Sequence, residues 1–419
     1  MLARRRRARL GTPTTKGPAV SMESDAPASA DLISDVASLT PMIRDECVVV
    51  DRARALPATV VDVLRKAGVF QLLAPRAVGG AETDPLTFLR VVEQVSYADG
   101  SAGWCTMIGG AYGIFGGMLS PEGAREIFGD PATISAGNFR PDKGMAEVID
   151  GGYRVSGCWE LASGSSHASW YIAGAMLVQD GAPISGPEGR PQMREFFFPA
   201  SEARVIDTWE STGLRGTASH DYEVRDTFVP ERRTLWFQEP PSEPGPLYRM
   251  PPVAMFATFI AAVQLGIARH AIDAFVELAT TKVPTMSETI LADRVTAQAT
   301  LGRARAQVSA AREYLENALQ SLWDRVEAGH APTLGDRGDL WLASAHAGHA
   351  AHAAIDMLYT AAGATAVYAA SPLDRCLRDA RTALQHVCTQ EVHFELAGRL
   401  ALERDAVASV WGLDYRGEG

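Results

Sequence analysis

The sequence predicts an α+β fold with an N-terminal helical domain, a middle antiparallel β domain and a C-terminal four-helix bundle. Three observations support this prediction: helical apolar spacing up to about residue 119, short β-rich segments from about residue 133, and long Ala-rich amphipathic runs from residue 253 onward. We expect the domains to span 26–132, 133–245 and 246–419. A chain of 419 residues can bury a substantial core across such units.

The N-terminal domain is predicted to be helical from Asp31 to about Leu119. The segment ATVVDVLRKAGVFQLL has apolar residues three and four apart and breaks at Gly68, and PLTFLRVVEQVSYA repeats the pattern after a turn-rich connector. From Ser101, SAGWCTMIGGAYGIFGGML is apolar throughout, which is typical of a buried helix. Its glycines allow close approach of a partner.

The middle domain is predicted from segments that are short, rich in Val, Ile, Phe and Tyr, and separated by Gly, Pro and Asp. These segments are AEVIDGGYRVSGCW, WYIAGAMLV, REFFFPA, ARVIDTW and YEVRDTFVP. DGGY predicts a hairpin turn, because Asp-Gly readily supplies the positive φ that such turns need.

The C-terminal bundle is predicted from helical runs at 253–281, 291–329, 338–362 and 373 to about 409. In the third run His346, His349 and His352 recur every three residues. No Asp, Glu or Cys stands between them at ligand spacing, so we predict packing or solvated roles and no metal site.

Composition limits the classes of partner. A net charge of −11 argues against nucleic acid and anionic membranes, and no uninterrupted apolar window approaches 18 residues. The five cysteines are scattered without a C-x-x-C pair, which favours a reducing, cytoplasmic setting. Residues 1–25 are basic and lack the apolar core of a secretory signal, so we expect a disordered extension.

Three segments in the correct order resemble the acyl-CoA dehydrogenase superfamily. GGYRVSGCWELASGSSHASWYIAGAMLV resembles its flavin segment, TGLRGTASHDYEVRDTFVP its second middle-domain stretch, and SPLDRCLRDA its P-x-x-R-x-x-R-D element. The resemblance implies an acyl-CoA dehydrogenase-like fold and a homotetramer whose bundles complete the flavin sites across subunits.

The dehydrogenase base is missing from both of its known places. Eight residues after Asp379 stands Val387, and no Asp or Glu occurs from Pro251 to Ile272. Without a carboxylate there is no obvious base for α,β-dehydrogenation of a thioester. His386 stands beside Val387, and together with SGSSHASW it resembles the flavin-dependent monooxygenases of this fold.

The monooxygenase resemblance implies an oxygenase component that takes reduced flavin from a separate flavin reductase and uses O2. Its substrate is expected to be aromatic or polyketide-like. The dehydrogenase glycine stretch G-G-x-G-Y is replaced by GATAV at 363–367, which implies FMN, supplied as FMNH2, in preference to FAD. A divergent FAD-dependent acyl-CoA dehydrogenase and a non-catalytic protein of the same fold are the alternatives.

The resemblance also assigns roles to individual residues. The catalytic candidates are Ser163 at flavin N5, His386 in acid-base chemistry, and Tyr112, which replaces a histidine of related hydroxylases and can hydrogen-bond a phenol. A turn serine and a helix histidine in the core are the structural alternatives. His393 is expected on the helical face of His386, seven residues further on.

Further candidates are expected to contact the cofactor. The resemblance places Asn138 at the flavin pyrimidine edge, Trp104 in the wall, and the polar residues of GLRGTASHD near the flavin or its phosphate. Those polar residues are Arg215, Thr217 and Ser219. Arg294 stands near where a neighbouring subunit's arginine reaches the flavin phosphates. Arg375, Arg378 and Asp379 are expected to be structural.

Overall fold

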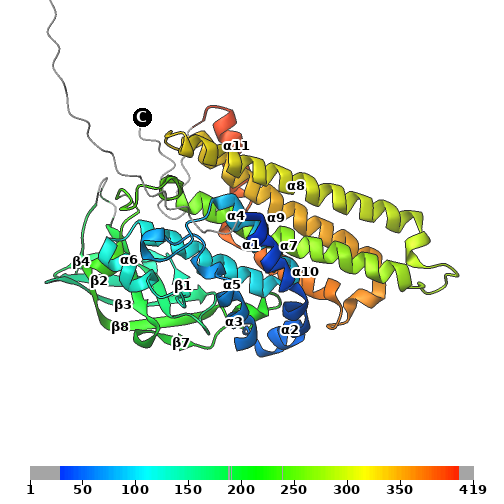
Figure 1. The fold of residues 1–419 in the computed structure, drawn as a ribbon, viewed down its shortest axis with the longest axis horizontal. Coiled ribbons are helices and arrows are strands. Elements are labelled where there is room, and N and C mark those ends of the chain that lie inside the picture. The colour runs from blue at the N-terminus through cyan, green and yellow to red at the C-terminus, as the bar shows by residue number, and fades with distance from the viewer. Residues whose placement is uncertain (1–28, 187–188, 190, 238, 405–419) are drawn as a thin grey trace, which may run out of the picture.

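A computed structural model describes residues 29–404, except 187–188, 190 and 238, so the predicted extension at 1–25 lies outside the described residues. The chain forms helices, then a sheet, then long helices, which confirms the predicted fold class. In Figure 1 the sheet and the N-terminal helices form one end of the molecule, and the long helices extend away from them.

The N-terminal helices pack around the pair α4 and α5. The helices of this part are α1 (Ser29–Ser38), α2 (Thr40–Ala53), α3 (Ala58–Lys66), α4 (Pro85–Ala98), α5 (Gly100–Ala111) and α6 (Pro121–Phe128). Asp99 alone separates α4 from α5, and its carboxylate accepts the Ala102 amide at 2.9 Å, which fixes the start of α5.

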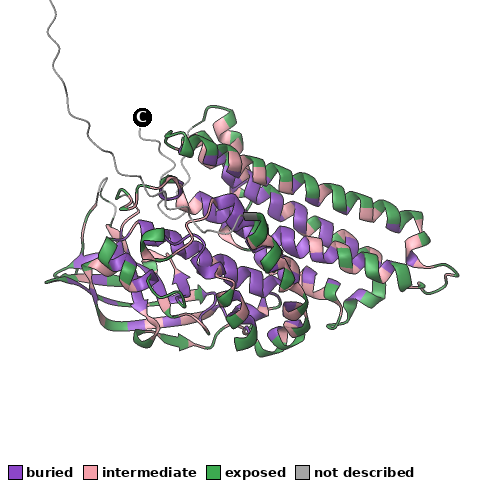
Figure 2. Ribbon diagram, viewed as in Figure 1, coloured by how far each residue is buried: buried purple, intermediate pink, exposed green. Residues whose placement is uncertain are grey.

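Helix α5 is buried and lies against α4, as its purple ribbon in Figure 2 shows. A Cβ at Gly103 would stand 1.9 Å from Ser96 Oγ, and one at Gly110 would stand 2.7 Å from the Phe88 ring. The glycines of this helix therefore permit the close approach that the sequence predicted: Gly103 and Gly110 lie against α4, and Gly109 lies against the Phe70 ring.

The middle domain is a mixed sheet with the strand order β7-β8-β3-β2-β4-β6-β9. Its strands are β1 (Ser135–Asn138), β2 (Gly144–Ile149), β3 (Gly152–Ala162), β4 (Trp170–Gln179), β5 (Ala182–Pro183), β6 (Met193–Pro199), β7 (Arg204–Ile206), β8 (His220–Pro230) and β9 (Thr234–Leu235). The expected antiparallel domain is confirmed for most of the sheet, and the two parallel pairs, β1 with β4 and β2 with β4, are the departures from it. The DGGY hairpin is confirmed between β2 and β3, with Gly151 at φ +76°.

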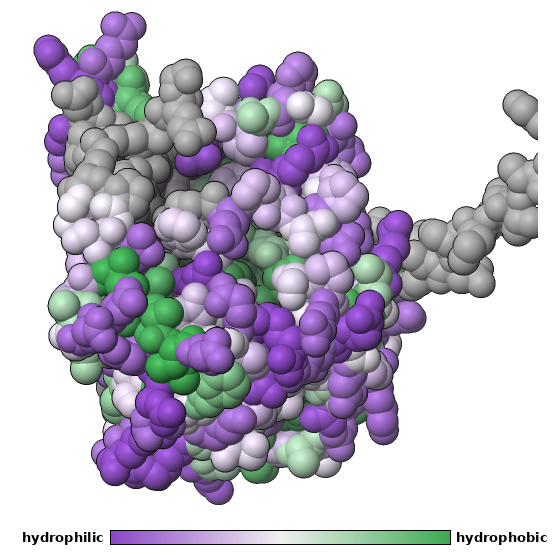
Figure 3. All heavy atoms as spheres, turned by 90° about the vertical axis from the view of Figure 1, so that its left-hand side faces the viewer, coloured by the Kyte–Doolittle hydropathy of each residue, from purple (hydrophilic) through white to green (hydrophobic). Residues whose placement is uncertain are grey.

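The two faces of the sheet belong to different cores. Trp159, Tyr171 and Tyr222 form a small core within the β domain, whereas Ile172 and Phe197 belong to the large core shared with the helices. Figure 3 shows the end of the molecule that lies on the left of Figure 1, where hydrophobic residues form a short stripe in a mostly hydrophilic surface.

The C-terminal part contains the long helices α7 (Pro252–Thr281), α8 (Val295–Glu327) and α9 (Leu334–Ala362). Helix α7 is long and apolar enough to cross a membrane by length and composition, but 83% of its most apolar window is buried inside the protein. Its apolar surface is used by packing against α4, α5 and α9. Burial of each large aliphatic or aromatic side chain stabilises the fold by about 1.5–3 kcal/mol.

The last predicted helix, 373 to about 409, is broken in the structure. Helix α10 (Pro372–Ala383) ends before His386, and α11 (Val392–Ala401) begins after it. The segment between them turns because Thr389 Oγ1 donates to Leu384 O at 3.2 Å and the His386 ring accepts the Cys388 amide at 3.3 Å. His393 therefore does not share a helical face with His386, and that expectation was wrong.

Candidate active site

A cavity of about 750 Å³ lies where the N-terminal helices, the sheet and the C-terminal helices meet. Its walls come from α5, the ends of β1 and β3, strand β6, the loop 209–219, the start of α7, and the break between α10 and α11. The volume is in the range of pockets that hold a cofactor or a drug-sized molecule.

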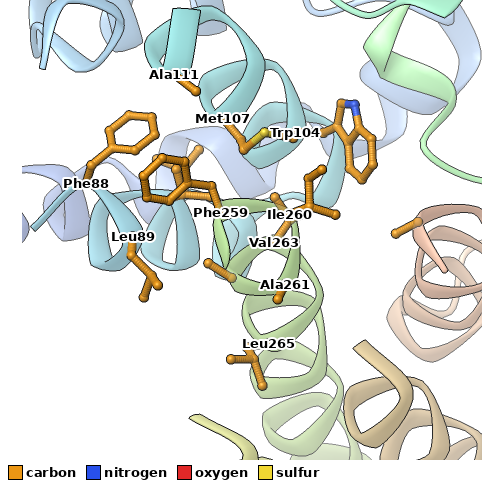
Figure 4. Close-up of a cluster of buried hydrophobic side chains, with 14 of the residues drawn as sticks. Phe88, Leu89, Trp104, Met107, Ala111, Phe259, Ile260, Ala261, Val263 and Leu265 are labelled. Carbon is orange, nitrogen blue, oxygen red and sulfur yellow. The ribbon is translucent and has the colours of Figure 1, made fainter. Parts of the chain in front are cut away.

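Helix α5 forms one long wall of this cavity. The residues that line the cavity recur at helical spacing: Trp104, Met107, Ile108 and Ala111 of α5, and Tyr112, which directly follows its last residue. Figure 4 shows Trp104 and Met107 projecting from α5 near Ile260 of α7, with the Trp104 indole at the edge of the hydrophobic cluster. Eight residues separate Trp104 from Tyr112, so the helix measures about 12 Å between them.

A chain of hydrogen bonds starts at Trp104 and runs through three buried hydroxyl groups. Trp104 Nε1 donates to Ser163 Oγ at 2.9 Å, Ser163 and Ser219 are joined at 2.7 Å, and Ser219 and Thr217 at 2.7 Å. Thr217 Oγ1 ends the chain by donating to Leu214 O at 2.8 Å. All three hydroxyl residues and Trp104 line the cavity.

The direction of each proton in this chain follows from its two ends. Each hydroxyl group has one proton. Since Thr217 gives its proton to Leu214 O, Ser219 must donate to Thr217, and Ser163 must then donate to Ser219. Ser163 already accepts the Trp104 proton, so the hydroxyl has only a lone pair left to offer to the cavity.

The loop that carries Thr217 and Ser219 is held against α10. Asp379 Oδ1 accepts the Leu214 amide at 2.6 Å, and a Cβ at Gly213 would stand 2.1 Å from the carbonyl oxygen of Arg378. Burial, together with the nearby charge of Asp99, raises the pKa of Asp379 to about 7. The R-D element therefore positions the hydroxyl chain, which gives Asp379 the structural role expected from the sequence.

His386 faces the cavity in the break between α10 and α11, with its ring 5.7 Å from that of Trp104. Burial lowers the pKa of His386 to about 4, so the ring is neutral at pH 7. Because Nδ1 accepts the Cys388 amide, the single ring proton is assigned to Nε2. In this arrangement His386 is a hydrogen-bond donor.

Tyr112 and Asn138 line the cavity, but their polar groups already have partners. The Tyr112 hydroxyl donates to Gly137 O at 3.1 Å. The Asn138 amide donates to Glu160 O at 2.9 Å and accepts the Arg140 amide at 2.8 Å. Tyr112 retains lone pairs for a ligand, and Asn138 shapes the end of β1.

The structure does not bring Arg215 and Arg294 into the cavity of their own chain. The Arg215 guanidinium binds Asp51 O at 3.0 Å and Ser211 O at 2.8 Å, so it attaches the loop to α2 and has no role in the wall. Arg294 precedes α8 at the end of α7 opposite the cavity. A contact from Arg294 to a neighbouring subunit stays a prediction.

Two cavity residues were missed by the sequence analysis. Leu161 has φ +62°, and 57% of its surface is exposed although it lines the cavity. No pattern in the sequence indicates this conformation. Glu195 is buried in the wall on β6, and the acidic residue inside REFFFPA was a signal that could have identified it.

The residues present fit a flavin ring. Ser163 offers an acceptor, Leu161 offers an apolar surface for a flat ring, and Trp104 and Ile260 provide further apolar walls. A reduced isoalloxazine carries an N–H at N5, and this donor matches the lone pair of Ser163.

Comparisons with known proteins agree with this geometry. Residues 40–126 match the family described as acyl-CoA dehydrogenase, N-terminal domain, and residues 258–391 match acyl-CoA dehydrogenase, C-terminal domain. The chain is 33% identical to indole-3-acetate monooxygenase of Pseudomonas putida, over 84% of this chain and 88% of the relative. It is 30% identical to the flavin-dependent monooxygenase oxygenase subunit HsaA of Rhodococcus jostii, over 83% and 92%.

A solved structure shares the whole architecture. XiaF from Streptomyces sp., in complex with FADH2 and glycerol, superposes with a TM-score of 0.83 at 28% identity. The match covers 91% of this chain and 97% of that one.

Proposed function

The chain belongs to the flavin-dependent monooxygenase oxygenase components of the acyl-CoA dehydrogenase fold, and we propose that it hydroxylates an aromatic substrate with reduced flavin and O2. The observation that supports this most directly is that Ser163 and His386, both of which line the cavity, each contact Trp104. The pair provides an acceptor for a flavin and a donor for a substrate in one apolar cavity.

The bound reduced flavin supplies the activation of O2. Ser163 would accept a hydrogen bond from the N5–H of a bound reduced flavin and so orient the ring in the cavity. His386 donates a hydrogen bond from its Nε2–H to the substrate oxygen, and this bond stabilises negative charge on that oxygen and makes the aromatic carbon more nucleophilic. Of the two acid-base roles that the sequence leaves open, proton acceptor and donor, this arrangement supports the donor, because the Cys388 amide occupies the lone pair at Nδ1 and the ring proton is at Nε2.

The apolar walls exclude water from this end of the cavity. Trp104 and Ile260 line it, and residues 254–268 of α7, around Ile260, are all buried. Water exclusion strengthens the hydrogen bonds made by Ser163 and His386 and protects reactive species from side reactions.

The acyl-CoA dehydrogenase alternative lacks its base in the structure as well. Val387 lines the cavity at the expected place of the carboxylate. The acidic residues in the wall are elsewhere: Glu160 pairs with Lys143 at 3.0 Å, and Glu195 lies towards the Tyr112 end of α5.

We propose FMN as the preferred flavin, supplied by a separate reductase, as the term oxygenase subunit implies for the relative HsaA. The replaced glycine stretch at 363–367 supports FMN over FAD. We also propose a homotetramer in which Arg294 of a neighbouring subunit reaches the flavin phosphate.

The test supplies the pure protein with FMNH2, ¹⁸O2 and a panel of phenols, and mass spectrometry follows incorporation of one labelled oxygen. We expect labelled product from the wild type and about 100-fold less from His386→Asn, because a positioned acid-base group typically contributes 10²–10⁴-fold. His386→Asn should still bind FMNH2. Bleaching of bound FAD by an acyl-CoA would instead identify a dehydrogenase, and failure to bind any flavin would identify a non-catalytic protein.

A further inference from the structure

Among the buried acidic side chains of the described residues, Glu195 differs from the others because one of its buried oxygens has no hydrogen-bond partner. Four such side chains are buried: Glu93, Asp99, Glu195 and Asp379. Glu93 binds Arg269 at 2.9 Å and also Arg312, Asp99 caps α5, and Asp379 accepts the Leu214 amide. Glu195 is only 7% exposed, and its buried Oε2 has no hydrogen-bond partner. A native protein keeps such a group rarely, and usually for a function.

The position of Glu195 on β6 directs it to the helical side of the sheet. It pairs with Gly174 of β4 and Leu235 of β9, and both Leu235 and Glu195 line the cavity. A Cβ at Gly174 would stand 3.2 Å from Glu195 Oε2 and 2.6 Å from Phe139 O. The carboxyl group therefore lies next to the chain at Phe139, where the absence of a side chain at Gly174 leaves room for it.

The surroundings of the carboxyl group favour its uncharged form. Burial raises the pKa of Glu195 well above its usual value. The neighbouring cation in the sequence, Arg194, is already engaged by Thr234 at 2.9 Å and by Glu231. A neutral carboxyl group has one O–H donor and one carbonyl acceptor.

Glu195 lies at the end of the cavity remote from His386. Glu195 Oε2 and Phe139 O both lie close to Gly174, and the Phe139 ring is 5.2 Å from the Tyr112 ring, so Glu195 is near Tyr112, whereas His386 contacts Trp104. Trp104 of α5 and Tyr112, which directly follows that helix, are about 12 Å apart along the helix axis. The aromatic rings of Phe139, Phe237 and Phe256 meet near Tyr112, with centroids 5.2–6.2 Å apart.

We propose that Glu195 determines specificity by hydrogen-bonding an uncharged hydroxyl or carbonyl group at the end of the substrate remote from His386. The substrate is then an aromatic system of two or more rings, because a single ring is too short to contact both ends. This inference rests on the proposed hydroxylase function, which supplies the reacting end at His386.

The test measures binding to the flavin-free protein, so that it does not depend on turnover. Quenching of tryptophan fluorescence gives Kd for 2,6-dihydroxynaphthalene, for 2-naphthol, and for 6-(aminomethyl)-2-naphthol, whose second group is cationic. We expect the wild type to bind the diol at least about 10-fold more tightly than 2-naphthol, since a site built for a hydroxyl group rejects the analogue that lacks it.

Two substitutions separate recognition from structure. Glu195→Gln keeps a donor and an acceptor, so it should retain the preference within about 3-fold, whereas Glu195→Leu should abolish it. Glu195→Leu should also raise Tm, because it removes an unpaired buried polar group. The matched control Glu93→Leu should lower Tm, since it leaves Arg269 and Arg312 without their carboxylate.

The proposal is wrong if Glu195→Leu keeps the preference for the diol, or if the wild type binds the diol and 2-naphthol equally. It is also wrong if the cationic ligand binds most tightly and Glu195→Gln loses it. A diol preference that depends on Glu195 without any labelled product would contradict the proposed function and leave the binding inference standing.

Discussion

Thr217→Val tests the direction of the protons in the hydroxyl chain, because it removes the inner acceptor with little change in side-chain volume. In the wild type, Ser219 donates to Thr217, and Ser163 donates to Ser219. Without the Thr217 hydroxyl, the Ser219 proton turns towards Ser163. The proton of Ser163 is then free to point into the cavity, so the polarity presented to a flavin can reverse.

The size of the effect follows from the two redox states of the ring. The N5–H of reduced flavin donates a hydrogen bond to Ser163, which stabilises binding by about 1 kcal/mol. N5 of oxidised flavin is an acceptor and faces the Ser163 lone pair without a hydrogen bond, which weakens binding by about 1 kcal/mol. The wild type should therefore prefer reduced flavin by about 2 kcal/mol, roughly 30-fold. Thr217→Val should reduce this preference about 10- to 30-fold and lower the midpoint potential of the bound flavin by about 30–45 mV.

The assay compares Kd for oxidised FMN in air with Kd for FMNH2 in an anaerobic titration, and spectroelectrochemistry gives the potential. Thr106→Val is the matched control, because Thr106 is also fully buried and its hydroxyl has no partner. The control should leave the ratio of the two Kd values unchanged. If Thr217→Val also leaves that ratio unchanged, or increases the preference for FMNH2, the proton assignment is refuted.

Three further predictions concern stability and the limits of the site. In the folded wild type the pKa of Asp379 is about 7, above the model-peptide value, so the free energy of unfolding falls by up to about 4 kcal/mol as pH rises from about 4 to 7. Asp379→Asn should remove this pH dependence, and urea denaturation at each pH measures it. His270 contributes a pH dependence of the opposite sign, because burial lowers its pKa to about 3: the free energy of unfolding of the wild type falls by up to about 5 kcal/mol as pH falls from 6.5 towards 3. His270→Gln should remove this loss, and a variant that unfolds in acid at the same pH as the wild type would contradict the prediction. Arg215→Met should lower Tm by a few degrees, because the hydrogen bonds to Asp51 O and Ser211 O are lost, and it should leave Kd for FMNH2 unchanged in the anaerobic titration. A higher Kd for FMNH2 with an unchanged Tm would indicate that Arg215 contacts the cofactor.

The sequence predicted those elements whose stability is local. Helix α4 spans the expected PLTFLRVVEQVSYA segment, because Asp84 caps it and Pro85 suits its first turn. Helix α7 likewise spans Pro252–Thr281, against an expected 253–281. In both helices the apolar spacing, a proline in the first turn and the packing favour the same conformation.

The break at His386 could not be predicted in this way. RTALQHVCTQEVHF contains no Gly or Pro and keeps helical spacing. The turn depends on contacts from distant parts of the chain, such as the bond between His349 Nε2 and Thr389 O at 3.1 Å. Tertiary packing therefore overrides local propensity, and it does so at the residue proposed to contact the substrate.

The sequence could predict which hydroxyl residues line the cavity, but it could not predict which hydrogen bonds those residues make. Ser163, Thr217 and Ser219 line the cavity together, but their order in one hydrogen-bonded chain requires coordinates. Arg215 lies in the same short motif and faces α2. Adjacent positions of a motif can thus belong to different faces of the protein.

The two ends of the cavity are supplied by separate segments, and this arrangement bears on how the enzyme could evolve. The hydroxyl chain depends on the end of β3 and the loop 213–219, whereas Glu195 and its neighbours Met193 and Leu235 belong to β6 and β9. Random libraries restricted to 193, 195 and 235 should change which molecules are accepted while oxygen chemistry continues. Enzymes of this kind can then accept new substrates after substitution of a few residues of β6 and β9, while the residues that hold the flavin stay unchanged.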